Sequence, residues 1–131
     1  MKKWSVFGVS IILVFFLSSL ASSIRINEVE LNPESSDSGK EWIELYSESE
    51  INLSGWKIMK GNNDFIEIEG IFTNYYLIEL QTRWLNNEDE QVFLYNNSTL
   101  EDESIIFSDT SNDNRTWQNC DNGWEFLDFT K

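Results

Sequence analysis

Carboxylates are the only abundant side chains in this sequence that could take part in catalysis. The 131 residues include 23 Asp and Glu, no His and a single Cys. The chain therefore lacks the commonest general base, and zinc sites built from His or Cys cannot form within one copy. An enzyme would need paired carboxylates, as in glycoside hydrolysis, and Glu41 and Glu44 are candidates. Because no phosphate-binding glycine loop or Gly-x-Ser-x-Gly elbow accompanies them, we predict that the protein is not an enzyme.

One loop has part of the oxygen pattern of a calcium site. Asp109, Ser111 and Asp113 stand at positions 1, 3 and 5 of a stretch whose side chains are rich in oxygen, as hard cations require. The twelfth position, where a calcium loop of the EF-hand type places a bidentate Glu, is Cys120. We predict a polar surface loop and no required cofactor. Ca²⁺ binding by these three residues is the alternative.

Four Asn residues begin the N-glycosylation pattern Asn-x-Ser/Thr. They are Asn52, Asn96, Asn97 and Asn114. Three of the four fall in predicted turns, a position compatible with glycosylation if the host modifies exported proteins. These residues are therefore candidate modification sites.

The N-terminal residues predict export. Lys2 and Lys3 precede an apolar stretch over residues 6–20, and small residues follow up to Ser23, which is the order of a secretory signal peptide. Since the stretch is shorter than the roughly 20 residues that span a bilayer, we predict a signal peptide over 1–23 that is cleaved after Ser23. The alternative is an uncleaved segment that anchors the domain to the outer face of the cytoplasmic membrane. The predicted location is therefore secreted or at the cell surface.

The remainder, residues 24–131, has the length of a single, strongly acidic domain. Cleavage leaves seven basic and 23 acidic residues, a net charge of −16. This charge repels phosphate backbones and anionic lipids, so we predict no nucleic-acid partner and no membrane contact except through residues 1–23. Cys120 cannot close an internal disulfide. It is either a small, partly buried apolar side chain or a site of intermolecular pairing.

Short runs rich in Ile, Val, Phe, Tyr and Trp recur between turn residues, and no stretch after Ser23 has a helical period. The sequence therefore predicts an all-β domain of about eight strands. We expect two hairpins, one joining 56–60 to 65–68 and one joining 91–95 to a return strand through 105–107. Other strands are expected at 24–31, 40–46, 75–80 and 124–129, with a short run around Ile51 and Leu53.

Several large or charged side chains have predicted structural roles. Four tryptophans are expected to fill the core of a small sandwich: Trp42, Trp56, Trp117 and Trp124. Glu28 and Glu44 lie among apolar neighbours, so we expect partly buried carboxylates that accept hydrogen bonds from backbone N–H groups. Residues 40–46 are apolar on both faces, which places this strand in the interior of its sheet.

Three segments resemble the lamin tail domain family in its exported prokaryotic form. They are residues 26–29 (INEV), 41–46 (EWIELY) and 53–56 (LSGW). Residues 92–95 (VFLY) with Asp102, and Arg115 with Trp117 and Trp124, resemble later parts of the family more loosely. The resemblance covers 24–131 and implies an immunoglobulin-like antiparallel β-sandwich. Two features depart from the pattern: Asn114 stands where a glycine usually precedes the arginine, and the sequence stops at Lys131 without the usual proline-rich stretch.

The resemblance and the missing catalytic residues favour an exported, non-enzymatic module. Such a module would bind a protein or an envelope or glycan component, or have a structural role at the cell surface, and pairing at a sheet edge is one route. Two alternatives stay open. One is an accessory domain that helps an exported nuclease or another hydrolase in trans, because lamin-tail-like domains are often fused to such enzymes. The other is a Ca²⁺-stabilised surface structural protein.

Overall fold

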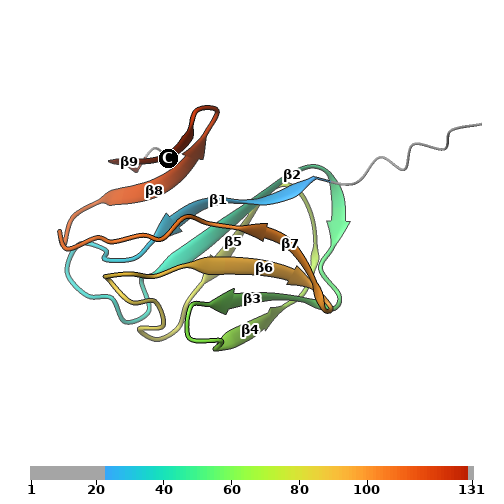
Figure 1. Cartoon of the computed structure of the whole chain (residues 1–131), viewed down its shortest axis with the longest axis horizontal. Helices are drawn as coiled ribbons and strands as arrows, with labels where there is room; N and C mark the ends of the chain where they lie inside the picture. Colours follow the sequence, from blue (N-terminus) through green and yellow to red (C-terminus); the bar gives the residue numbers. More distant parts are fainter. Residues whose placement is uncertain (1–22, 130–131) are drawn as a thin grey trace, which may run out of the picture.

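The computed structural model describes residues 23–129, and this part of the chain forms nine β-strands (Figure 1). The predicted signal peptide, apart from Ser23, lies outside the described residues. Among the described residues, no helix has the length and hydropathy to cross a membrane. The strands are β1 (Ile24–Glu30), β2 (Trp42–Asn52), β3 (Trp56–Lys60), β4 (Phe65–Ile68), β5 (Ile71–Glu79), β6 (Val92–Asn96), β7 (Thr99–Glu103), β8 (Arg115–Cys120) and β9 (Gly123–Asp128).

The strands form two antiparallel sheets packed against each other. The five-stranded sheet has the order β5-β2-β1-β8-β9, and the four-stranded sheet has the order β4-β3-β6-β7. This confirms the predicted all-β class and the two-layered antiparallel architecture. The predicted interior position of the strand over 40–46 is also confirmed, because β2 lies between β5 and β1.

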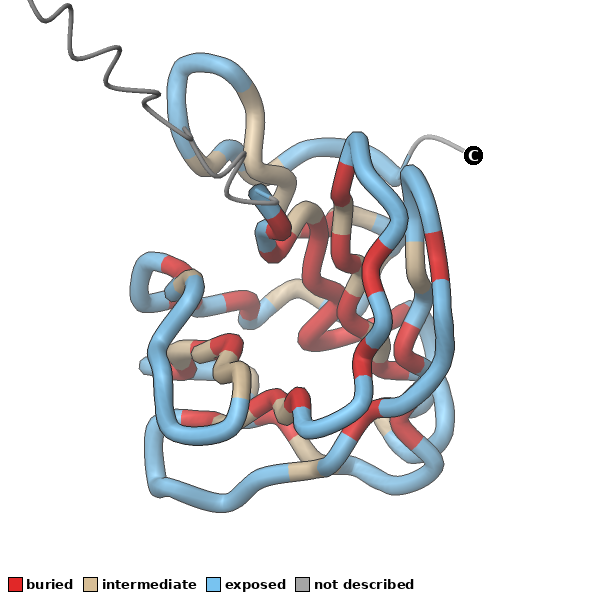
Figure 2. Tube along the Cα trace, turned by 90° about the vertical axis from the view of Figure 1, so that its right-hand side faces the viewer, coloured by how far each residue is buried: buried red, intermediate tan, exposed pale blue. Residues whose placement is uncertain are grey.

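Alternating apolar side chains of both sheets build the core. Buried positions alternate with half-buried ones along the first half of β2 and along β3, and Figure 2 shows the buried positions of the two sheets facing each other. Trp56 is buried in this core, and Trp117 and Trp124 pack against it from β8 and β9, with ring centroids 5.3 and 4.9 Å from that of Phe107. The prediction that Trp42 is a core residue is wrong. Its neighbours in β2 point inward, so Trp42 lies on the outer face of the five-stranded sheet, 5.4 Å from the ring of Phe129.

The return strand of the second predicted hairpin is misplaced. It was expected through 105–107, but β7 occupies Thr99–Glu103, directly after the turn that follows β6. Asn97, with a φ of 53°, closes this turn, so that Asn96 already pairs with Thr99. The apolar residues that suggested a strand lie beyond it. Phe107 is buried and joins Glu90 through an isolated bridge.

At one corner of the sandwich, two neighbouring segments cross together from one sheet to the other. The chain leaves the end of β2 and turns into β3, and alongside it β4 continues through a bend into the start of β5. The N–H of Leu53 donates to the carbonyl of Gly70 across this corner, at 2.8 Å. Gly55 (φ 83°) and Gly70 (φ 127°) provide the two bends, in conformations that favour glycine.

Buried carboxylates fix the loops that connect the sheets. Glu41 accepts hydrogen bonds from the backbone N–H groups of Trp84 and Leu85, at 2.7 and 2.9 Å. Glu90 in the same way accepts from Gly61 and Asn86, at 3.1 and 2.8 Å. A charged acceptor strengthens such bonds, so each carboxylate ties a loop to the core.

We expect Glu90→Ala to lower the free energy of unfolding by about 3 kcal/mol, because loop N–H groups lose a charged acceptor in a buried position. Urea denaturation measures the change. Glu88→Ala is the matched control, since Glu88 is exposed on the same loop. Equal stabilities of the two variants would show that Glu90 does not hold the loop.

Candidate functional site

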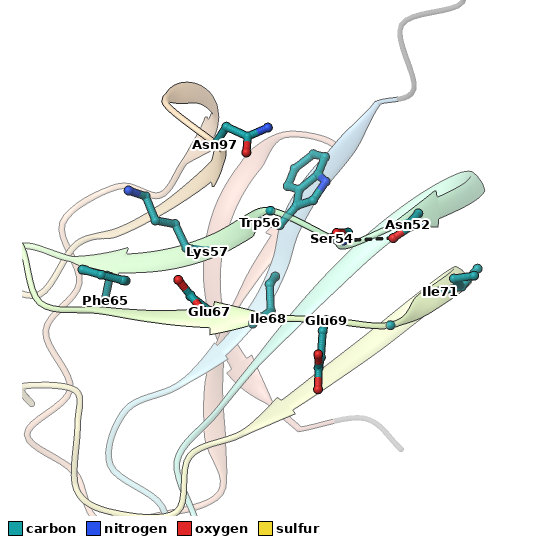
Figure 3. Close-up of a pocket in the computed structure, with 12 residues that line it drawn as sticks. Asn52, Ser54, Trp56, Lys57, Phe65, Glu67, Ile68, Glu69, Ile71 and Asn97 are labelled. Atoms are coloured by element: carbon teal, nitrogen blue, oxygen red, sulfur yellow. Dashed lines mark hydrogen bonds between the residues drawn. The ribbon is translucent and has the colours of Figure 1, made fainter.

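A groove of about 860 Å³ lies at the corner where β4 continues into β5 (Figure 3). The end of β2, the turn before β3, strands β3 and β4 and the start of β5 all contribute to its walls. Phe65 and Ile71 are exposed apolar side chains on these walls. Lys57 of β3 and Glu67 of β4 lie beside Phe65, whereas Ile71 lies at the other end of the groove near Asn52 (Figure 3). The groove therefore combines apolar contact area with both signs of charge, as ligand sites do.

Lys57 has a fixed place in this groove. Its Nζ lies 5.1 Å from the ring centroid of Phe65 and 5.4 Å from that of Tyr95. These cation–π contacts hold the ammonium group against the outer face of the four-stranded sheet. Glu67 and Glu69 also line the groove, so acidic side chains outnumber basic ones there.

Large exposed apolar side chains continue from the groove along β5. Ile71 is 64% exposed, Tyr75 60% and Leu77 50%. Tyr75 lies against Tyr46 of β2, with ring centroids 5.1 Å apart, and the guanidinium of Arg25 covers the Tyr46 ring at 4.9 Å. Ile71 lies in the groove and begins β5, and we call the groove and the outer face of β5 together the β4–β5 surface.

The candidate calcium residues lie in one loop before β8, but two of their carboxylate groups are engaged locally. Asp113 binds the side chain of Arg115 through both oxygens, the shortest contact being 2.8 Å. Asp109 is buried, and its Oδ1 accepts the N–H of Ser111 at 2.9 Å, whereas Oδ2 has no partner. Within residues 23–129, no group of three or more Asp, Glu, His or Cys side chains is arranged to hold a metal ion. Ca²⁺ binding stays a prediction.

Two of the four glycosylation candidates lie at the groove, which the sequence alone did not predict. Asn52 and Asn97 are exposed and line the groove, so an oligosaccharide on either would stand at its mouth. Asn114 is exposed just before β8. Asn96 is half-buried at the end of β6, and Cys120 is a half-buried free thiol at the end of β8.

The carboxylates singled out in the sequence have other partners than expected. Glu28 is buried and Glu44 half-buried, as predicted, but each accepts from a side chain instead of a backbone N–H: Glu28 from Thr116, and Glu44 from Asn27 at 2.8 Å. Glu41 and Glu44 do not form a catalytic pair. Residues three positions apart in an extended chain point to opposite faces, and Glu41 points toward Trp84 and Leu85.

The β4–β5 surface can offer a ligand contacts of several kinds. Its walls offer apolar area, a fixed ammonium group and carboxylates, and the buried carboxylate Glu41 lies away from it, within a loop contact. No family model, no curated protein and no solved structure matches the chain. This surface could not be predicted from the sequence, because the residues that form it come from distant segments, among them Asn52, Phe65 and Asn97.

Glu30 has a strongly raised pKa, because it is buried close to the loop that carries Asp109 and Asp113. Burial, together with the negative charges of Asp109, Asp113 and Glu28, raises its pKa from the ordinary value of 4.5 to about 7, although the hydrogen bond from the N–H of Asn32 opposes the shift. The folded state therefore binds more protons than the unfolded state between these pH values. Stability contributed by Glu30 is present below pH 4.5 and is lost as the pH rises through about 7.

We expect Glu30→Gln to be more stable than the wild type by about 2 kcal/mol near pH 8, and equally stable near pH 4. This figure is smaller than the full shift implies, because solvent screens part of the interaction. The amide keeps an oxygen for the N–H of Asn32. Urea denaturation at both pH values measures the difference, with the exposed Glu88→Gln as control. A constant difference at the two pH values would contradict the raised pKa.

Proposed function

We propose that this protein is an exported, non-enzymatic binding module and that the β4–β5 surface holds its ligand. One observation carries the proposal. Four of the nine large apolar side chains that are exposed among the described residues lie on β4 and β5: Phe65, Ile71, Tyr75 and Leu77. Exposed apolar side chains that gather on two consecutive strands beside a groove are typical of an interaction site, whereas single exposed side chains are common everywhere.

The placement of the buried carboxylates supports binding over turnover. Glu41 and Glu90 accept backbone N–H groups of loops, and Asp102 of β7 accepts the N–H of Ile26 on β1 at 2.7 Å, which joins the two sheets. Side chains committed in this way hold the fold together. The groove itself offers contact area and charge, which suit recognition.

We also propose that the sandwich is immunoglobulin-like and of the lamin-tail type. The support is the sequence pattern together with its position in the two sheets. The INEV segment lies in β1 beside the EWIELY segment, which ends in β2, where Val29 pairs with Ile43. The LSGW segment makes the bend from β2 into β3, so the three matching segments meet in adjoining parts of the fold.

Export is part of the same proposal. The first strand begins at Ile24, directly after the predicted cleavage site, and Ile24 is buried and pairs with Ser47. Cleavage after Ser23 would therefore leave β1 complete. A protein or an envelope or glycan component is the proposed class of partner.

The export proposal predicts that native protein is recovered from the medium or the cell surface with Ile24 as its first residue. N-terminal sequencing and intact mass measurement test this, and the same mass reports whether Asn52, Asn96, Asn97 or Asn114 carries a glycan. Protein found only in the cytosol, with Met1 or Lys2 at its start, would contradict export.

The binding proposal predicts that Ile71→Ser weakens capture of the native partner about tenfold, because roughly 1–2 kcal/mol of apolar contact is lost. The measurement is quantitative pull-down of envelope and medium components from the native host. Ile106→Ser is a close control, since Ile106 is 63% exposed and Ile71 64%, but Ile106 lies outside the β4–β5 surface. Thermal unfolding should change little in both variants. Equal losses of capture would place the ligand elsewhere.

A further inference from the structure

β5 presents an unpaired edge, which is regular beyond Asn74, a residue with a φ of 70°. Residues Asn74–Glu79 pair with Trp42–Ser47 of β2 in six successive antiparallel positions. On the other side, no strand of the described part of the chain pairs with β5. Alternate backbone N–H and C=O groups along an edge strand point away from its sheet and can accept a further strand.

The other edge strands carry features that discourage such pairing. Three of the five residues of β7 are acidic, and Asp102 among them is already bonded to β1. β9 contains Glu125 and Asp128, and β4 has only four residues. In contrast, the nine residues of β5 include a single charge, Glu79 at its end, and neither lysine nor proline. β5 is therefore the edge strand with the fewest of the features that usually protect a sheet edge from pairing.

The side chains of β5 add specificity to the open backbone. Tyr75 and Leu77 project from the outer face of the sheet and are exposed, while Ile78 points into the core. The packing of Tyr75 on Tyr46 gives it a defined position. A strand added beside β5 would place every second side chain next to Tyr75 and Leu77, where apolar groups are favoured.

Exposed carboxylates surround this edge. Glu48 and Glu50 lie in the irregular part of β2 next to the start of β5, Glu69 precedes β5, and Glu79 ends it. The whole chain has a net charge of −14. The complementary partner is a strand with basic residues, and electrostatic attraction would also speed its approach.

We propose that β5 accepts an extended segment of another protein in which apolar residues alternate with Lys or Arg, and that this segment pairs with β5 as an additional strand. The inference rests on the proposed binding function and names its class of partner. A second copy of this chain is disfavoured as the occupant, because each copy brings the same negative charge to the edge.

The test uses the full domain and three labelled peptides of eight residues with equal numbers of Val and Lys. In the first, Val and Lys alternate. The second has the same residues in two blocks, and the third is the alternating peptide with N-methyl groups on its central residues, which removes hydrogen-bond donors but keeps the charge. Fluorescence anisotropy should show the alternating peptide binding at least tenfold more tightly than the other two. Amide hydrogen exchange at Asn74–Glu79 should slow on its binding.

Two variants with identical charge changes localise the binding. Leu77→Lys should weaken binding of the alternating peptide at least tenfold, because it places a lysine on the edge strand. Ile106→Lys adds the same charge away from β5 and should weaken binding only slightly. Circular dichroism and thermal unfolding confirm that both variants are folded.

Three results would overturn the proposal. Equal affinities for the three peptides would show adhesion by charge alone. Equal effects of Leu77→Lys and Ile106→Lys would place the peptide elsewhere. A concentration-dependent dimer in analytical ultracentrifugation that Leu77→Lys abolishes and Ile106→Lys preserves would assign the edge to a second copy.

These outcomes are distinguishable from failure of the proposed function. If Ile71→Ser reduces capture of the native partner while the alternating peptide does not bind, the β4–β5 surface is a ligand site but not by strand addition. If the peptide binds β5 while Ile71→Ser and Ile106→Ser capture the native partner equally, the groove is not the ligand site.

Discussion

The geometry of the β4–β5 surface depends on the corner that the hydrogen bond between Leu53 and Gly70 holds together. This bond joins the two chain segments that cross from one sheet to the other at the same corner. Because the segments cross as a pair, β4 becomes the last strand of one sheet and β5 the last strand of the other. The groove lies at that crossing, and the open edge of β5 begins beside it.

Charged acceptors stabilise this sandwich in the absence of an internal disulfide. Glu41 and Glu90 bind loop N–H groups, and Asp102 links β7 to β1. Burial also has a cost, since it raises the pKa of Glu41 and Asp102 by disfavouring the charged form. The fold thus gains defined loops at the expense of desolvated carboxylates.

Local pattern was sufficient to predict some elements and insufficient for others. The hairpin over 56–60 and 65–68 matches β3 and β4 residue for residue, because strong turn formers separate two alternating apolar runs. β7 was misplaced because its sequence, TLEDE, is polar and an edge strand needs little apolar area. β8 was not predicted as a strand because its sequence, RTWQNC, is also largely polar. The buried acceptors Glu41 and Glu90 could not be told from other acidic residues, since the partners Trp84 and Leu85 of Glu41 and the partner Gly61 of Glu90 lie far away along the chain. The β4–β5 surface could not be predicted either, because the residues that form it lie far apart in the sequence.

The acidity of the chain and the open edge of β5 are physically connected. A long, uncharged edge strand normally invites pairing between copies, and most sheet proteins prevent this with charges on the edge itself. Here the charge lies mostly on the rest of the molecule, and the net value of −14 opposes association between identical copies. Repulsion of this kind does not act on a basic strand. If β5 accepts a basic strand as we propose, the same negative field would favour that partner over a second copy, and the surface charge would contribute to specificity as well as to solubility.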